Sequence, residues 1–245
     1  MPRKPLLASA LALLVTLPAL AEDTLRFSVS NSWNMPFARF DNERLTGGIM
    51  YDLGMALERP LGRSITFVVL PRKRIDAASL AGDIDLRCYI NPKWTDIPDQ
   101  FVWSGRMFDL PNVVFGMDRT EPVKDLAEVK RGSAISTVLG YSYPTLEPLL
   151  TDGQLLREDT IDQEKVMLKV SAGRTPYGVA DLLALNWYQR TTPLHRHAAW
   201  RLVVSREDIQ CAIPKKGQVP ADKILVALDG LRKSGKIEEI LRNYR

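Results

Sequence analysis

Histidine is scarce in this sequence, and the clusters of reactive side chains that metal sites and many enzymes need are missing. The 245 residues include two histidines, His195 and His197, in a polar stretch without a neighbouring cysteine or carboxylate cluster. An i, i+2 pair of this kind is a poor metal site, so we expect a surface loop. No G-x-S-x-G elbow, Cys-His pairing or P-loop occurs. We therefore expect no catalytic residue, no metal and no cofactor.

Long apolar runs are absent after the first 21 residues. Arg3 and Lys4 form a short positive head, an apolar run follows over residues 6–20, and Ala21 ends it with a small side chain. This order is typical of a secretory signal peptide. The alternative is an uncleaved membrane anchor, but a run of about 15 residues is shorter than the ~20 that cross a bilayer as a helix. We expect residues 1–21 to be a signal peptide that is cleaved after Ala21.

A strong excess of charge is missing as well. The chain has 33 Lys and Arg residues against 29 Asp and Glu residues, a net charge of +4. Cleavage of the signal peptide would remove two positive charges, and the others are dispersed along the chain. A nucleic-acid-binding protein concentrates its basic side chains on one face, so we expect no nucleic-acid partner. The 224 residues that remain can form one large domain or two of about 100 residues.

Cysteine is limited to two residues, Cys88 and Cys211, each in an apolar, strand-like stretch. In an exported protein an even number of cysteines permits a disulfide. The alternative is a pair of buried free thiols, because cysteine is among the most buried residue types. The sequence leaves both possibilities open.

Strand and helix patterns alternate along the chain, without low-complexity tracts or Gly/Ser linkers. The continuous apolar and β-branched run at 65–70 is typical of a buried parallel strand. Strand, helix, strand, helix and strand are expected in that order at residues 25–30, 49–61, 65–70, 72–80 and 84–90. This alternation predicts an α/β unit with a mainly parallel sheet.

A second set of elements begins near residue 120. In chain order we expect a helix start at 123–126, a strand at 133–138, helical segments at 145–150 and 160–172, a strand at 177–180, a helix at 181–190, one or two strands within 200–213, and helices at 221–231 and 237–244. The chain is therefore predicted to form two similar α/β lobes, with a tail that is free to return to the first.

Several short motifs follow one another in an informative order. Residues 25–37 run from a strand to a Pro-Phe pair, 45–53 read LTGGIMYDL, and 80–85 read LAGDID. Residues 228–244 combine a helix, a Ser-Gly turn and a last helix that ends in an aromatic residue. Together they resemble a divergent branch of the periplasmic solute-binding proteins of the amino-acid-binding type (bacterial extracellular solute-binding family 3), the receptors of ABC importers. The resemblance covers essentially the whole chain after the signal peptide.

This resemblance implies a type II periplasmic-binding-protein fold, in which two α/β lobes are joined by two crossover strands and hold a ligand in the cleft. Lobe I would span residues 22–115, lobe II 116–208, and 209–245 would return to lobe I. Ligand contacts from both lobes would favour a closed state. The resemblance also implies a periplasmic monomer whose partners are a small-molecule solute and a membrane protein, either the permease of an ABC importer or a membrane sensor.

One motif of such proteins is missing. They place an Arg after the fourth strand, in a T-x-x-R stretch, to hold the α-carboxylate of the ligand, whereas residues 91–97 here read NPKWTDI. Residues 72–74 (RKR) replace an aromatic residue that commonly follows Pro71. A guanidinium in this place can hold a carboxylate or a phosphate, although most charge triplets are exposed helix turns. Arg74 is favoured by its spacing, and Arg87 is the other candidate unless it pairs with a buried acid.

Ligands of open α/β sheets bind beyond the carboxyl ends of the strands. Aromatic faces beside an amide suit apolar or cationic groups, and a glycine loop before a helix can bind an anion through its N–H groups. Asp181 lies where the resemblance places the acceptor of a ligand's amino group; the alternative is a helix N-cap. The candidate ligand-binding residues are Asn31, Trp33, Arg74, Tyr89, Asn91, Trp94, Gly140, Tyr141, Ser142 and Asp181.

The expected function is capture of a small polar solute, amino-acid-like or related, for an ABC importer. Two alternatives use the same cleft: a ligand-sensing module for a membrane signalling partner, and a dehydratase-like enzyme on the same scaffold. An enzyme would need an acid or base positioned in the cleft, and the Glu residues fall mostly in helical or exposed contexts.

Overall fold

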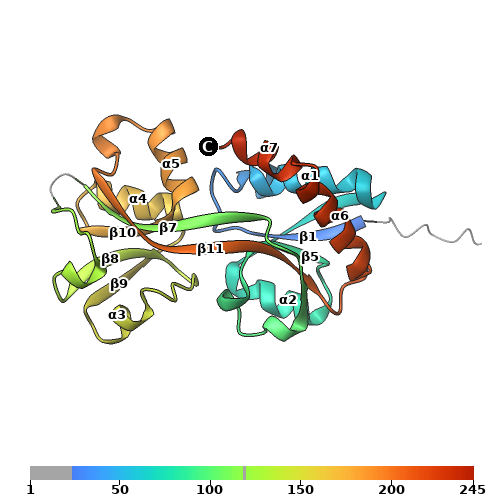
Figure 1. Cartoon of the computed structure of the whole chain (residues 1–245), viewed down its shortest axis with the longest axis horizontal. Coiled ribbons are helices and arrows are strands. Elements are labelled where there is room, and N and C mark those ends of the chain that lie inside the picture. Colours follow the sequence, from blue (N-terminus) through green and yellow to red (C-terminus); the bar gives the residue numbers. More distant parts are fainter. Residues whose placement is uncertain (1–23, 118–119) are drawn as a thin grey trace, which may run out of the picture.

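The computed structural model describes residues 24–117 and 120–245 (Figure 1). In this part of the chain a single curled sheet with the strand order β4-β1-β5-β11-β7-β10-β8-β9 connects two α/β lobes, which confirms the predicted two-lobed fold. The predicted signal peptide lies outside the described residues. No helix within those residues is long and apolar enough to cross a membrane.

Lobe I, on the right in Figure 1, is built on parallel strands. β1 (Thr24–Ser30) lies between β4 (Ser64–Leu70) and β5 (Leu86–Ile90) and pairs in parallel with both. The run at 65–70 predicts a buried parallel strand. β4 is a parallel strand as predicted, but the predicted burial is wrong: β4 lies at the sheet edge, and all of its residues keep some exposure. An apolar run at an edge packs one face against α1, so it needs no cover on the other.

The helices of lobe I are α1 (Ile49–Leu61), α2 (Ile75–Ala81), α6 (Ala221–Lys233) and α7 (Lys236–Arg242). The last two pack against α1, so the end of the chain belongs to lobe I. Gly48 precedes α1 with a φ of 100°, and a Cβ there would meet the Phe37 carbonyl oxygen at 2.6 Å. Glycine therefore lets the loop after β1 lie against the first turn of α1, where Ile49 N donates to the Pro36 carbonyl at 2.8 Å. This contact fixes the loop that carries Trp33.

Two short strands of lobe I, β2 (Arg39–Asp41) and β3 (Arg44–Gly47), form a separate hairpin that the sequence patterns do not predict. The helix expected at 72–80 is present as a 3-10 turn at Arg72–Arg74 followed by α2, and it ends at Gly82 in the left-handed conformation. The three basic residues of this turn differ in burial: Arg72 is half-buried, whereas Lys73 and Arg74 are exposed.

Lobe II continues the sheet with β7 (Phe108–Gly116), β10 (Tyr177–Asp181), β8 (Ser133–Val138) and β9 (Leu155–Thr160). Its helices are α3 (Glu147–Thr151), α4 (Gln163–Ser171) and α5 (Leu182–Thr191). β9 is missed at the sequence level because its charged residues, in an exposed edge strand, hide the alternation. The helix start expected at 123–126 is a 3-10 turn at Leu126–Glu128, capped by the side chain of Asp125.

Two long strands pass between the lobes. β7 pairs in antiparallel register with the first part of β11 (Trp200–Pro214), from Gly116↔Trp200 to Phe108↔Ile209. The end of β11 pairs with β5 and with β6 (Phe101–Trp103). The segment at 200–213 is thus one strand that takes part in both lobes. The predicted lobe boundaries fall inside β7 and β11, and that division stays a prediction.

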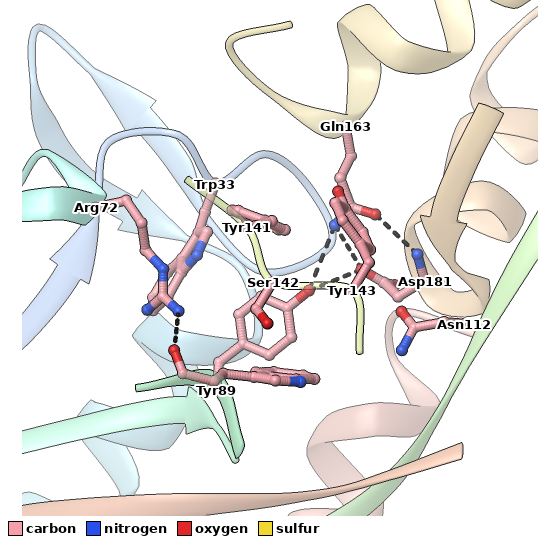
Figure 2. Close-up of a pocket in the computed structure, with 10 residues that line it drawn as sticks. Trp33, Arg72, Tyr89, Asn112, Tyr141, Ser142, Tyr143, Gln163 and Asp181 are labelled. Atoms are coloured by element: carbon pink, nitrogen blue, oxygen red, sulfur yellow. Dashed lines mark hydrogen bonds between the residues drawn. The ribbon is translucent and has the colours of Figure 1, made fainter. Parts of the chain in front are cut away.

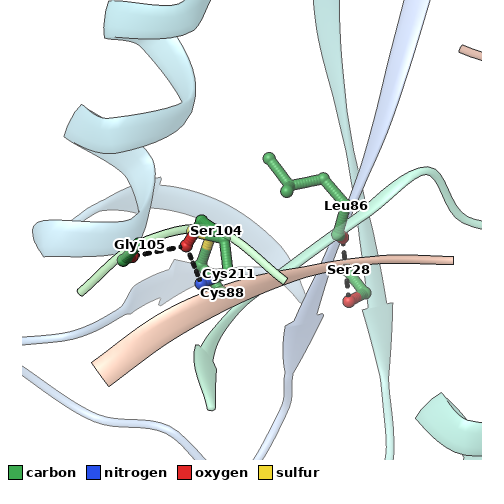
Figure 3. Close-up of a disulfide and its surroundings, with 6 residues drawn as sticks. All are labelled: Ser28, Leu86, Cys88, Ser104, Gly105 and Cys211. Carbon is green, nitrogen blue, oxygen red and sulfur yellow. Dashed lines mark hydrogen bonds between the residues drawn. A yellow bond between two sulfur atoms is a disulfide. The ribbon is translucent and has the colours of Figure 1, made fainter. Parts of the chain in front are cut away.

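The two cysteines form a disulfide (Figure 3). Cys88 of β5 and Cys211 of β11 lie opposite each other in the antiparallel pair, with Cα atoms 4.0 Å apart. The backbone N–H of Cys211 also donates to the Ser104 hydroxyl at 2.8 Å. Of the two possibilities left open by the sequence, the structure has the disulfide, and this bond joins a crossover strand to lobe I.

Candidate functional site

A pocket lies between the two lobes (Figure 2). Lobe I contributes Trp33, Arg72, Tyr89 and Trp94, and the pocket is completed from β7 and lobe II by Asn112, Tyr141, Ser142, Tyr143, Gln163 and Asp181. The space at its centre is about 40 Å³, room for only a few water molecules. A ligand of more than a few atoms therefore requires the lobes to move apart.

The pocket walls follow from the sheet. Trp33 comes after β1, Arg72 after β4, and Tyr141 after β8, while Tyr89 and Asp181 lie at or near the ends of β5 and β10. The carboxyl ends of parallel strands meet at one edge of each lobe, and the crossover strands bring these two edges face to face. This is the position that the sequence predicts for a ligand site.

Tyr89 is held in an unusual conformation at the end of β5. Its φ of 57° is in the left-handed region, which is uncommon for a residue other than glycine. Its ring stacks on Phe37, with centroids 4.0 Å apart, and meets Trp33 edge to face at 5.2 Å. Backbone and packing together aim the phenol across the cleft.

A hydrogen-bond cluster joins the lobes at this phenol. The Tyr89 hydroxyl donates to Asp181 Oδ2 at 2.8 Å, and Gln163 Nε2 donates to the same oxygen at 2.5 Å. Asp181 Oδ1 accepts from the backbone N–H of Ala184 at 2.7 Å and so caps α5. Burial raises the pKa of Asp181 even though these donors act in the opposite direction. Of the two roles considered for Asp181, the structure shows the N-cap, and acceptance of a ligand's amino group stays a prediction.

Arg72 is the only basic residue among those that line the pocket. Its Nη2 donates to the Trp94 carbonyl at 3.4 Å, and its guanidinium carbon lies 6.0 Å from the centroid of the Tyr141 ring. The side chain is half-buried and has no ion pair within the described part of the chain. Most of its five N–H donors therefore face the pocket or solvent.

Arg87 lies behind the pocket, fully buried, and forms an ion pair with Asp76. Burial, together with the nearby charge of Arg72, lowers the pKa of the Arg87 guanidinium. Thr95 Oγ1 also donates to Asp76 at 3.2 Å. Of the roles open to Arg87 at the sequence level, pairing with an acid is the one that the structure shows.

Six of the ten candidate residues line the pocket, namely Trp33, Tyr89, Trp94, Tyr141, Ser142 and Asp181. The other four do not. Asn31 and Arg74 are exposed, and Gly140 is exposed with a φ of 77°. Asn91 is buried, but its side chain accepts from Lys93 N at 2.9 Å and donates to the Asp208 carbonyl at 3.1 Å. Contact of any of the ten with a ligand stays a prediction.

Four lining residues are absent from the candidates: Arg72, Asn112, Tyr143 and Gln163. Arg72 belongs to the basic triplet, in which spacing favours Arg74 instead. Gln163 follows Asp162, which accepts from Lys165 N at 2.7 Å as the N-cap of α4. An Asx residue before a helical pattern is a readable signal, and it would have placed Gln163 at a helix start beside the cleft.

The two histidines lie apart from the pocket. His195 is exposed in a 3-10 turn, as expected for a surface loop, and one ring nitrogen of His197 lies 2.9 Å from the Thr192 carbonyl oxygen. Within residues 24–117 and 120–245, no group of three or more His, Cys, Asp or Glu side chains is placed to hold a metal ion.

The fold of this chain is similar to that of known proteins. No protein-family model matches the chain, and no curated protein matches it in sequence. An ancestral arginine-binding protein bound to arginine superposes with a TM-score of 0.75 and 21% identity over 91% of this chain and 98% of that chain. The chain therefore has the two-lobed fold of the periplasmic binding proteins, and its resemblance to the amino-acid-binding type, predicted from the motifs, extends to the structure.

Other proteins of similar structure include both binding proteins and a sensor domain. The arginine-, lysine-, histidine-binding protein ArtJ from Geobacillus stearothermophilus has a TM-score of 0.69 and 16% identity, over 90% of this chain and 94% of that chain. A histidine kinase sensor domain with similarity to periplasmic binding proteins has a TM-score of 0.70 and 17% identity, over 90% and 95% of the two chains. Identities this low establish the fold, and a particular ligand or role does not follow from them.

The bond between Tyr89 and Asp181 can be tested against a matched tyrosine. Tyr89→Phe removes a hydroxyl that donates to a buried carboxylate, so we expect a loss of about 1.5–3 kcal/mol in the free energy of unfolding. Tyr188 is equally buried, but its hydroxyl has no hydrogen-bond partner within the described residues. Tyr188→Phe should therefore be neutral or slightly stabilising. Urea unfolding of both variants measures the difference, and equal losses would contradict the interlobe bond.

Proposed function

We propose that this chain is an exported solute receptor that binds a small polar molecule between its lobes and presents it to a membrane importer of the ABC type. The observation that carries the proposal is a pocket with walls from both lobes and from a crossover strand. A ligand in such a pocket stabilises the closed arrangement, because it contacts both lobes only when they are together. The membrane partner would then recognise closure.

The same proposal includes the location and the division of the chain. Residues 1–21 would direct export and be removed, leaving a periplasmic monomer. Residues 22–115 and 209–245 would move as one lobe against residues 116–208. The paired strands β7 and β11 would supply the hinge, because they connect the lobes along the edge of the cleft.

Catalysis is not part of the proposal. The one carboxylate among the residues that line the pocket is Asp181, and its oxygens accept hydrogen bonds from three protein groups. A general acid or base must reach a reacting group, and this carboxylate is directed toward protein donors. Aromatic walls of this kind are typical of pockets that bind a small molecule.

The proposal predicts a stabilising ligand. A compound that binds only the folded protein raises its stability by about 2.7 kcal/mol at a hundredfold excess over the dissociation constant. A thermal-shift screen of organic acids, amino acids, polyamines and sugars with the chain from residue 22 onward should therefore identify a class that raises Tm. Trp33 and Trp94 line the pocket, so binding should also change the tryptophan fluorescence.

Absence of a stabiliser in all four classes would count against the receptor. A compound that raises Tm equally in a variant with the cleft filled, such as Ser142→Trp, would show binding elsewhere. Ser142 is exposed at the pocket rim, so the larger side chain can be accommodated during folding but narrows the entrance.

Sensing is the second candidate, favoured by the kinase sensor domain among the similar structures. Uptake of the ligand by cells separates the two roles. Deletion of the gene should abolish high-affinity uptake if the chain serves an importer, and restoration of the gene should recover it. Unchanged uptake together with an altered transcriptional response to the ligand would favour the sensor.

A further inference from the structure

The carboxylate of the pocket is fully engaged by the protein. Asp181 Oδ2 accepts from Tyr89 of lobe I and Gln163 of lobe II, and Oδ1 accepts from the backbone at the start of α5. Gln163 is engaged too, because its Oε1 accepts from Asp181 N at 2.8 Å. A ligand ammonium would have to displace one of these donors, and Asp181 as a residue is only 3% exposed. With the lobes in this arrangement, the Asp181 carboxylate therefore has no free oxygen for a ligand ammonium.

Donors, in contrast, are plentiful. Among residues 24–117 and 120–245, the guanidinium of Arg72 has a single hydrogen bond, to the Trp94 carbonyl. The Tyr141 hydroxyl is buried without a hydrogen-bond partner among the described residues, although the Ser32 hydroxyl is close enough to influence it. Ser142, Trp33 and Trp94 belong to the same lining, and their side chains carry hydroxyl and indole N–H donors. An acceptor-rich ligand would satisfy these groups.

The charged residues near Arg72 also favour a negatively charged ligand. The guanidinium of Arg72 in the lining and that of Arg87 behind it repel each other, which helps to lower the pKa of Arg87, and Asp76 pairs with Arg87 alone. An anion beside Arg72 would relieve that repulsion in a half-buried site, where charges interact more strongly than in bulk water. Asp181 lies on the opposite wall of the pocket from Arg72.

On these grounds we infer that the ligand is a small organic carboxylate without an α-ammonium group, held by Arg72 and the Tyr141 hydroxyl, with its apolar part against the aromatic walls. This inference rests on the proposed solute-binding function and specifies its substrate class. A guanidinium binds a carboxylate through two parallel N–H···O bonds. The ammonium of the matched amino acid would have to compete with Tyr89 and Gln163 for the Asp181 carboxylate, which is costly.

The test compares acids that differ only in the group on the α-carbon. Isothermal titration of the chain from residue 22 onward with pyruvate, lactate, propionate and alanine, and with phenylpyruvate, phenyllactate and phenylalanine, keeps the carboxylate and the side chain constant within each series. We expect the best oxo-, hydroxy- or unsubstituted acid to bind at least tenfold more tightly than its amino acid. Propylamine and propionamide serve as cationic and neutral probes and should not bind.

Two glutamine substitutions in one 3-10 turn provide the matched control. Arg72→Gln removes the charge from the pocket and should weaken binding of the best acid by about 10- to 100-fold. Arg74→Gln removes a charge from an exposed residue of the same turn and should leave the affinity unchanged. Arg72→Lys should recover part of the loss, since an ammonium keeps the charge without the bidentate geometry. Urea midpoints confirm that each variant is folded.

The results of these titrations can contradict the inferred ligand class without contradicting the proposed receptor function. Tighter binding of an amino acid than of its matched acid would overturn the carboxylate inference and leave the receptor intact, as would full affinity in Arg72→Gln. If no acid, amino acid, amine or amide binds in the titrations or in the broader screen, the proposed receptor function fails with it.

Discussion

Replacing Asp85 with alanine should lower the free energy of unfolding by about 3–5 kcal/mol, the range measured when one partner of a buried ion pair is removed. Asp85 is fully buried at the base of lobe I and pairs with Arg26 of β1 through Oδ1–Nη2 at 2.8 Å and Oδ2–Nε at 2.9 Å. Its Oδ1 also accepts from Gln218 N at 2.6 Å, just before α6. One carboxylate thus joins β1, β5 and the last helices, and alanine would leave all these donors unpaired.

A surface pair serves as the control. Asp109 and Arg206 are 2.9 Å apart on the crossover strands, but their side chains are 40% and 63% exposed. Water and salt screen such a pair, so Asp109→Ala should cost no more than about 1 kcal/mol. Urea unfolding of both variants measures the difference. Equal losses for the two substitutions would show that Asp85 contributes no more than a surface charge.

The loss at Asp85 should also depend on pH. Burial alone would raise the pKa of this carboxyl, but the hydrogen bonds from Arg26 and from Gln218 N outweigh burial and lower the pKa. The unfolded chain therefore binds the proton more readily than the folded chain. The contribution is complete above the unfolded pKa of about 4 and is lost as the pH falls through the folded pKa. The gap in stability between wild type and Asp85→Ala should narrow below about pH 4.

Much of the fold can be predicted because local and periodic signals agree. In α1, apolar residues recur at helical spacing and Gly62 ends the helix in the left-handed conformation, so its bounds follow from the sequence. In β9 and in the hairpin of β2 and β3 the signals are absent, because these short, exposed strands are stabilised by their neighbours rather than by an apolar face. Such elements depend on tertiary context.

The site shows a similar division. The rule that ligands bind beyond strand ends places Trp33, Tyr141 and Asp181 around one cleft without any structure. The rule cannot choose between Arg72 and Arg74. These residues are two positions apart in a 3-10 turn of about three residues per turn, so their side chains leave the turn in different directions. That choice depends on how the turn meets the rest of the lobe.

At Asn91 the sequence contains a signal for a structural role, which is the proline that follows it. An Asn followed by Pro is typical of an N-cap with proline at the first helical position. The structure has this arrangement, with the Asn91 side chain accepting from Lys93 N, so the amide is engaged before any ligand arrives. A polar side chain that already binds the neighbouring backbone, as Asn91 does, has fewer hydrogen-bonding groups left for a ligand.

Loss of the disulfide should cost about 4 kcal/mol. Cys88 and Cys211 are 123 residues apart in sequence, so the bond closes a long loop and removes many conformations from the unfolded chain. The double variant Cys88→Ala, Cys211→Ala should therefore unfold at a much lower urea concentration than the oxidised protein. Both residues are fully buried, so the alanines also leave a small cavity in lobe I.

Reductant separates the crosslink from this cavity. When the wild-type protein is unfolded and refolded in dithiothreitol, its urea midpoint should fall most of the way to that of the double variant. The midpoint of the double variant should not change with dithiothreitol, because this variant has no thiols. The denatured, unreduced wild type should contain no titratable thiol. Two thiols per chain in that assay, or equal urea midpoints with and without reductant, would contradict the bond. Since the disulfide attaches crossover strand β11 to β5, its loss should also weaken ligand binding by loosening the lobe that carries Tyr89.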